Sequence, residues 1–265
     1  MMLLYGKVVA ENIQQEIQQK VQNGFDKKLC TIGFEQAEWL QYVTSLQKTC
    51  QKHGICCENI VSKDGILPQE FFRLVEDTCK RQDVQGVMVQ QPLPKQYKDA
   101  VNFVDVNKDV DCLNPLSVAK LYLGESGLLP ATPKAVLQLL DYYKIDVAGK
   151  NVVVVGRGRA VGKPLALMLL ARNATVTICH TKTQNIAQIC KNADIIVSAC
   201  GVAGLITQDF VTEKSIVVDV GLSFVDGKTC GDVDKSVYEV ASAVSPVPGG
   251  VGPITRMALL QNLLK

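Results

Sequence analysis

The sequence has few of the residues that build metal sites, nucleic-acid surfaces or membrane spans. It contains only two histidines, His53 and His180, and no Cys-x-x-Cys pair, so it lacks the ligand spacing of a zinc site. Lys and Arg number 28 against 26 Asp and Glu, and aromatic residues make up 6%, which argues against nucleic acid as a partner. No apolar run approaches the roughly 20 residues that cross a bilayer. We therefore expect no metal, no nucleic-acid partner and no membrane partner.

The ten cysteines are spread along an apolar chain of 265 residues, 47% of which are hydrophobic. This pattern favours small, reduced, mostly buried side chains over a disulfide framework. The first residues, 1–7, carry no basic group before their short apolar run and so do not resemble a signal peptide. These features predict a cytoplasmic protein.

Helical periodicity alternates along the chain with short apolar runs, as residues 8–22 illustrate. There, Val9, Ile13, Ile17 and Val21 recur every four residues and predict one buried helix face. The other predicted helices are 36–53, 68–81, 132–144 and 161–172, and the predicted strands are 29–34, 55–61, 86–90, 152–155, 174–179, 195–199 and 216–220. Alternation of this kind predicts an α/β fold with parallel sheets, and the polar stretch 123–127 marks the expected boundary between two domains.

A glycine-rich turn is the most informative local motif. Gly156, Gly158 and Gly162 follow the apolar strand 152–155 and open the helix 161–172, with the spacing G-x-G-x-x-x-G. Glycines let the backbone approach a pyrophosphate, and the helix N-terminus presents free N–H groups to it. The motif predicts a dinucleotide site, and the alternative is a tight strand-to-helix turn without a ligand.

The end of the next strand distinguishes between the two dinucleotides. An NAD enzyme usually places an acidic residue there for the ribose hydroxyls, whereas residues 180–182 are His, Thr and Lys. Arg157, Thr181 and Lys182 are suited to a 2′-phosphate through charge-assisted hydrogen bonds. This favours NADP over NAD, with solvated surface charge as the alternative reading of Arg157 and Lys182.

Several stretches then line up in a fixed order. Besides the glycine turn, they are 90–94 (QQPLP), 108–111 (KDVD), 219–221 (DVG), 231–233 (GDV) and 245–253 (SPVPGGVGP). The chain thereby closely resembles the methylenetetrahydrofolate dehydrogenase/methenyltetrahydrofolate cyclohydrolase family over nearly its whole length.

The resemblance implies a two-domain α/β protein of folate-dependent one-carbon metabolism. Residues 1–124 would form an N-terminal α/β folate domain, and 125–249 a Rossmann-type parallel-sheet domain that binds NADP. The C-terminal helix, about 250–265, would pack back on the first domain. A homodimer and oxidation of 5,10-methylenetetrahydrofolate to 5,10-methenyltetrahydrofolate are also implied.

The resemblance also implies the site residues. Tyr42 would stack on the folate, Gln90 would position the reacting centre, and Asp111 would anchor the amino-pyrimidine end of the pterin, with Asp109 structuring its loop. The residues implied to line the folate cleft with backbone groups are Gly249, Gly250 and Val251, and those implied to bind NADP are Gly156, Arg157, Gly158, Gly162, Thr181 and Leu222.

One position departs from the family pattern in a way that bears on the chemistry. The family reads Tyr-Val-x-x-Lys-x-Lys after the tyrosine, and the first lysine is catalytic; here Leu46 stands in that place and Lys48 matches the second lysine. Lys48 lies about 200° further around a helix and should face away from the cleft. The upstream stretch 33–41 lacks the family's acidic-Pro-Ala-Ser loop and is one residue longer, and Trp39 within it is expected to be a packing residue.

The two reactions of the family differ in their need for that lysine. Hydride transfer requires alignment of two bound molecules, whereas hydrolysis of the methenyl cation requires a general acid–base, typically worth about 10²–10⁴-fold. Leu46 is therefore expected to weaken the cyclohydrolase step and to spare the dehydrogenase step. The alternatives are a fully bifunctional enzyme with a compensating residue, a non-catalytic folate- or nucleotide-binding relative, and a shikimate-type dehydrogenase.

Overall fold

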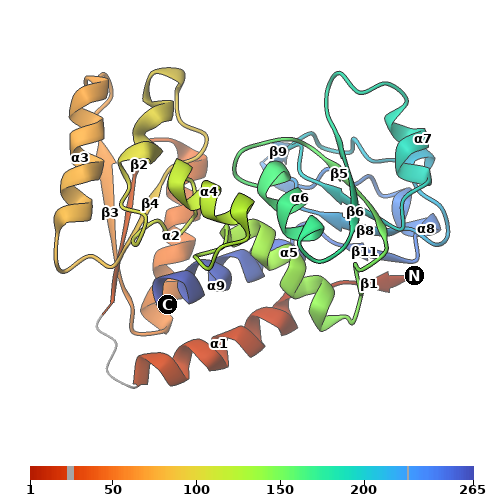
Figure 1. Ribbon diagram of the computed structural model, residues 1–265, viewed down its shortest axis with the longest axis horizontal. Coiled ribbons are helices and arrows are strands. Elements are labelled where there is room, and N and C mark those ends of the chain that lie inside the picture. The colour runs from red at the N-terminus through yellow and green to blue at the C-terminus, as the bar shows by residue number, and fades with distance from the viewer. Residues whose placement is uncertain (23–26, 226) are drawn as a thin grey trace. The chain divides into compact units, whose positions relative to one another are not determined.

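The computed structural model describes residues 1–22, 27–225 and 227–265 (Figure 1). The chain divides into two compact units, and each is described by itself. The first-half unit consists of Gln14–Ala131 and Leu259–Lys265, and the second-half unit of Met1–Ile13 and Thr132–Ala258. Both are α/β, which confirms the predicted fold class. The sequence predicts limits at 124 and 249, whereas these units divide at 131 and 258, and the first 13 residues belong with the later part of the chain.

The first-half unit is built on a parallel sheet with the order β3-β2-β4 (Figure 1). The central strand β2 (Lys28–Phe34) is buried along six of its seven residues, as expected of a parallel strand covered on both faces. β3 (Cys56–Ser62) and β4 (Gly86–Val89) flank it, and helices α2 (Ala37–Lys52) and α3 (Pro68–Lys80) pack against the sheet.

Two further segments complete this unit, and periodicity did not predict either of them. They are the 3₁₀ segment η1 (Lys95–Phe103) and helix α4 (Pro115–Leu123). The side chain of Asn114 caps α4 by accepting a hydrogen bond from the Leu116 N–H at 2.8 Å. Phe34, at the end of β2, stacks on Phe71 of α3 with ring centroids 4.8 Å apart, so the strand end is anchored in an aromatic core.

The second-half unit contains a six-stranded parallel sheet with the order β1-β11-β8-β7-β5-β6. Its strands are β1 (Met2–Leu3), β5 (Asn151–Val155), β6 (Thr175–Cys179), β7 (Ile195–Ser198), β8 (Ile216–Asp219) and β11 (Ala243–Ser245). A separate hairpin joins β9 (Ser223–Val225) to β10 (Lys228–Cys230). The helical segments of the described chain that lie wholly or partly in this unit are α1 (Gly6–Gln22), α5 (Ala131–Tyr142), α6 (Gly162–Leu170), α7 (Ile186–Lys191), η2 (Gln208–Phe210), α8 (Val237–Val240) and α9 (Val251–Leu263).

The strand order places a switch point beside β5. The chain passes from β5 to β6 on one side and then returns to β7 on the other side. In open parallel sheets, ligands bind at the carboxyl ends of strands where the order reverses in this way. The glycine turn directly follows β5 and therefore lies at this position.

Within residues 1–22, 27–225 and 227–265, no helix is long and apolar enough to cross a membrane. No disulfide joins the ten cysteines, all of which are described, and six of them are buried.

Candidate active site

The glycine turn has a tightly packed base and an open side. Gly156 has a φ of +124°, and a Cβ on it would collide with the carbonyl oxygen of Ala199 at the end of β7. A Cβ on Gly162 would collide with the carbonyl oxygen of Gly156, whereas one on Gly158 would meet nothing within 4 Å. No side chain caps α6 at Val161, the Lys163 N–H donates to the carbonyl of Gly158 at 3.1 Å, and the turn is open at Gly158. This cradle fits the pyrophosphate of a dinucleotide.

The ends of β5 and β6 lie side by side, because the N–H of Gly156 donates to the carbonyl of Cys179 at 2.8 Å. After β6 the chain forms a compact turn in which the Lys182 N–H donates to Nδ1 of His180 at 3.1 Å. His180 thus shapes the turn, while Arg157 and Thr181 are exposed together with Lys182. The structure therefore brings the predicted 2′-phosphate residues to one edge of the sheet, and residues 180–183 include no acid.

Two buried aspartates explain the motifs 219–221 and 231–233 in structural terms. Asp219 accepts hydrogen bonds from the N–H groups of Gly221 and Val233, both at 2.9 Å, and burial raises its pKa to about 6. Asp232 accepts from the hydroxyl of Ser198 at 2.8 Å and from two backbone N–H groups. These carboxylates fix the loops that follow β7 and β8. Leu222, which directly follows Gly221 in the loop after β8, is 59% exposed.

Helix α2 carries the predicted tyrosine and Leu46, where the family resemblance implies a lysine. Tyr42 is partly exposed, and its ring stacks on that of Trp39 with centroids 6.2 Å apart. Leu46 has no exposed surface and shares the buried face of α2 with Val43. Lys48 is exposed, as expected from its place around the helix. Trp39 is 5% exposed, so it packs as predicted.

Gln90 is almost completely buried at the end of β4, and both ends of its amide are engaged. Its Oε1 accepts from the N–H of Phe34 at 2.6 Å, and its Nε2 donates to Oε1 of Gln36. Sequence reasoning did not identify Gln36, because residues 36 and 90 are far apart in the chain. The longer stretch 33–41 was the only signal at this position.

The loop 109–117 presents the predicted aspartate. Asp109 is buried and accepts hydrogen bonds from the Asn114 N–H at 2.8 Å and the Ser117 hydroxyl at 2.6 Å, so it structures this loop as predicted. Asp111 lies in the turn between them and is partly exposed. Desolvation, followed by the nearby carboxylate of Asp109, raises the pKa of Asp111 to about 7.

The predicted backbone lining 249–251 belongs to the second-half unit, at the start of α9. Gly249 has a φ of +114°, and its carbonyl accepts from the N–H of Gly6 at 2.8 Å. A Cβ on Gly6 would collide with the carbonyl oxygen of Gly250, and Val251 is buried. These residues therefore tie the start of α1 to the start of α9.

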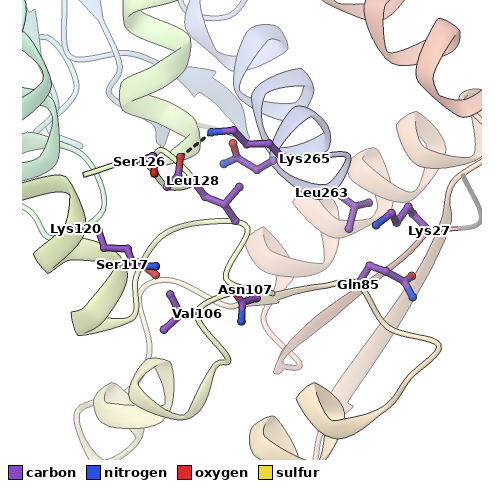
Figure 2. A pocket seen from close by; sticks show the side chains of 12 residues that line it. Lys27, Gln85, Val106, Asn107, Ser117, Lys120, Ser126, Leu128, Leu263 and Lys265 are labelled. Carbon is purple, nitrogen blue, oxygen red and sulfur yellow. Dashed lines mark hydrogen bonds between the residues drawn. The ribbon is translucent and has the colours of Figure 1, made fainter. Parts of the chain in front are cut away.

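A cavity of about 420 Å³ occupies a different part of the first-half unit (Figure 2). Lys27 and Gln85, which precede β2 and β4, line it, whereas Gln90 follows β4 at the opposite edge of the sheet. Lys265 closes one side by donating to the carbonyl of Gly127 at 2.7 Å. None of the predicted folate residues lines this cavity.

Comparison with known proteins gives matches over almost the full chain. Residues 4–111 match the tetrahydrofolate dehydrogenase/cyclohydrolase catalytic domain, and residues 130–265 match the NAD(P)-binding domain of the same family. The bifunctional protein FolD of Clostridium novyi (strain NT) is 42% identical over 268 residues, which cover 97% of this chain and 96% of that protein.

Comparison with solved structures leads to the same family. The structure of the bifunctional methylenetetrahydrofolate dehydrogenase/cyclohydrolase FolD from Campylobacter jejuni has a TM-score of 0.95 at 38% identity and covers 100% of this chain and 97% of its own. The Trypanosoma brucei enzyme, solved with NADP cofactor and inhibitor, has a TM-score of 0.93 at 32% identity, covering 100% and 96%. With both of its domains matched, the chain belongs to the tetrahydrofolate dehydrogenase/cyclohydrolase family.

Proposed function

We propose that this protein oxidises 5,10-methylenetetrahydrofolate to 5,10-methenyltetrahydrofolate with NADP as the cofactor. The observation that carries the proposal is the glycine turn after β5, whose base is closed by the Ala199 and Gly156 carbonyls and whose side at Gly158 is open. Such a cradle at a strand switch point suits a pyrophosphate. When bound, NADP accepts the hydride that leaves the one-carbon bridge of the folate.

The residues of the second-half unit bind and orient the cofactor. Backbone N–H groups around Gly156 and Gly162 meet the pyrophosphate, and Leu222 contacts the dinucleotide further along the sheet edge. Arg157 and Thr181 bind the 2′-phosphate with Lys182, and the absence of an acid at 180–183 removes the group that would repel it. This arrangement supports NADP over NAD.

The folate residues act by position rather than by proton transfer. Tyr42 stacks on the pterin or the aminobenzoate, Gln90 positions the reacting carbon, and the backbone of 249–251 lines the folate. Asp111, with a pKa raised to about 7, is partly protonated at neutral pH. The N–H groups of an amino-pyrimidine favour its ionised form, so substrate binding is expected to draw the proton off this carboxyl.

We propose in addition that the cyclohydrolase step is weakened. Opening of the methenyl ring needs a group that moves a proton, and position 46 offers only a buried hydrocarbon. Lys48, the nearest lysine on α2, is exposed two residues further on. A fully bifunctional enzyme would require another residue to supply the acid–base function.

Both reactions are tested with the purified protein. Formation of reduced NADP from methylenetetrahydrofolate is followed by absorbance, and methenyltetrahydrofolate decay is compared with its rate in buffer. We expect rapid reduction of NADP and methenyl decay close to the buffer rate. Absence of NADP reduction would overturn the dehydrogenase proposal, and brisk enzymatic decay would overturn the weakened cyclohydrolase.

Dinucleotide preference is tested at Arg157. Loss of one charged hydrogen-bond donor is worth about 1.5–3 kcal/mol, so Arg157→Ala should raise KM for NADP roughly tenfold to a hundredfold. KM for NAD should stay the same, because NAD has no 2′-phosphate. Arg172→Ala, at the opposite end of α6, is the matched control and should change neither value. An equal rise for both dinucleotides would contradict the assignment.

We also propose that the protein is a homodimer, as the family resemblance implies. Sedimentation equilibrium of the purified chain should give twice the 28.8 kDa of one chain. A monomer at micromolar concentration would overturn this part of the proposal.

A further inference from the structure

The amide of Gln90 has one defined orientation. One end of the amide faces the backbone N–H of Phe34. Because an N–H can only donate, the amide atom that faces it must be the carbonyl oxygen Oε1. The Nε2 group then faces Gln36 and donates to its Oε1. Because Phe34 ends β2 and Gln36 precedes α2, one short segment holds both ends of the amide.

At the helix start Gln36 takes part through its backbone, whose carbonyl accepts from the Leu40 N–H at 2.9 Å. Its side chain does not cap α2, although it occupies the N-cap position, and the residue is exposed. Glutamine is not among the residues that favour the N-cap position, so capping of the helix does not explain this side chain. The hydrogen bond to Gln90 is therefore the contact that accounts for this residue.

Trp39 adds a second group to the same place. The edge of its indole ring that carries Nε1 and the Oε1 atom of Gln90 both lie against Gly33, where any Cβ would collide with them. The indole N–H is buried and has no hydrogen-bond partner. A buried donor left in this state costs about 1–3 kcal/mol, which is recovered if a ligand supplies an acceptor. Its neighbours Gln36 and Tyr42 are exposed and partly exposed, so the donor lies close to the surface.

Trp39 lies on the same helix as position 46, where the family resemblance implies a lysine. Trp39 and Leu46 are two helical turns apart and are buried on one face of α2. Where the family has a charged amine, this chain has neutral donors and a hydrocarbon.

We infer that Gln36 is a positioning residue that fixes the Gln90 amide, and that the Trp39 indole N–H donates a hydrogen bond to an acceptor of the bound reduced pterin. This inference rests on the proposed dehydrogenase function. It extends that function by assigning substrate contact and alignment to a segment, 36–39, in which the chain departs from its family.

The positioning role is tested with three variants in the NADP reduction assay. Gln36→Ala frees the Gln90 amide and should lower kcat roughly tenfold, the equivalent of one hydrogen bond, with KM for NADP unchanged. Gln36→Glu keeps an acceptor for Nε2 and should restore kcat. Gln41→Ala, an exposed residue on the same helix, should leave kcat unchanged. Equal kcat values for Gln36→Ala and Gln41→Ala would overturn the role of Gln36.

Trp39 is the only tryptophan in the chain, so its fluorescence reports on this place alone. Titration with 5-formyltetrahydrofolate should change the emission in a saturable way. Replacing Trp39 by benzothienylalanine, in which sulfur replaces the indole N–H, should raise KM for methylenetetrahydrofolate roughly tenfold, without lowering the melting temperature. An unchanged KM in this shape-matched variant, or a loss of melting temperature that accounts for the lost activity, would overturn the assignment.

The experiments distinguish failure of the dehydrogenase function from failure of the contact between Trp39 and the folate. If the wild-type protein does not reduce NADP, the dehydrogenase function is wrong, whereas saturable quenching by the folate would still support the contact with Trp39. If the wild-type protein reduces NADP and the emission of Trp39 does not respond to the folate, the contact is wrong and the dehydrogenase stands.

Discussion

Leu46 has no exposed surface and lies on the face of α2 that packs against β2 and β3. The family resemblance implies a proton-transferring lysine at this position, whereas this chain has a side chain that stabilises the core. A buried hydrocarbon of this size contributes about 1.5–3 kcal/mol to folding. Under the proposed function, the side chain that weakens the cyclohydrolase step is thus also one that stabilises the packing of α2.

A lysine at position 46 should lower the stability of the protein and, under the proposed function, raise its cyclohydrolase activity. In Leu46→Lys an unpaired charge enters the core, and we expect a loss of roughly 3–5 kcal/mol in the free energy of unfolding, measured with urea. Leu46→Met conserves volume and should cost less than about 1.5 kcal/mol. If Leu46→Lys is as stable as Leu46→Met, the side chain does not lie in the core. Under conditions where Leu46→Lys stays folded, faster methenyl hydrolysis than the parent would indicate an otherwise competent site.

Asp111 should make stability depend on pH. Its pKa is about 7 when folded against 3.8 normally, so the folded state holds this proton more firmly than the unfolded state. The free energy of unfolding should therefore fall as pH rises from about 4 to about 7, and the cost should persist above that range. In Asp111→Asn this fall should shrink, which urea titrations at about pH 4 and about pH 8 will measure.

Asp219 provides an internal reference for that experiment. Burial raises its pKa to about 6, so it contributes a fall of the same sign over a lower range, and this part remains in Asp111→Asn. An identical pH profile for the variant and the parent would contradict the effect assigned to Asp111.

At the scale of elements, glycines serve as close-approach points for other groups. A Cβ on Gly221 would collide with the carboxylate of Asp232, and one on Gly231 would collide with that of Asp219. The carboxylate of Asp232 therefore packs on Gly221, and the carboxylate of Asp219 packs on Gly231. These contacts hold the loops after β7 and β8 together. The rigid edge so formed borders the strand ends that hold the dinucleotide.

Replacement by alanine should destabilise the protein at one glycine of the dinucleotide turn and leave its stability unchanged at another. Gly162→Ala pushes α6 away from the turn and should cost about 1–3 kcal/mol in stability and abolish the thermal shift that NADP produces. Gly158→Ala meets open space and should retain the parent's melting temperature without ligand. The measurement is differential scanning fluorimetry with and without NADP. Equal melting temperatures for the two variants would show that the turn is looser than described.

The sequence predicts elements well where periodicity is long. Residues 8–22 and 36–53 closely match α1 and α2, and the apolar run 152–155 lies within β5. Short elements such as β1 and β11 were not predicted, because two or three residues are too few to show a periodic pattern. These strands form because they pair with strands distant in the sequence. The contact between Gln36 and Gln90 escaped for the same reason, since only the fold brings these positions together.

At the scale of the whole molecule, each compact unit is assembled from separate stretches of chain. The second-half unit takes its edge strand β1 from the first residues, which pair with Ala243 and Val244 of β11. Leu4 follows that strand, is fully buried, and donates its N–H to the carbonyl of Val244 at 2.9 Å. The sheet is therefore complete only when segments about as far apart as the sequence allows have met.

Leu4 should accordingly stabilise a unit whose other residues, apart from the first 13, all lie after position 131. Leu4→Ala should lower the free energy of unfolding by about 2–5 kcal/mol, whereas Met2→Ala, at an exposed position, should change it by less than about 0.5 kcal/mol. Urea unfolding followed by circular dichroism measures both. A negligible effect of Leu4→Ala would indicate that β1 is not an integral part of the sheet.

The pairing of β1 with β11 also constrains how the protein is made. β1 is synthesised about 240 residues before its partner β11 and must wait for it, while the intervening first-half unit already has the residues for its own three-stranded sheet. At roughly 5–20 residues per second, that wait lasts about ten seconds or more. β1 thus stays unpaired until β11 has been made, and the larger sheet closes only after all strands of the first-half unit have been synthesised.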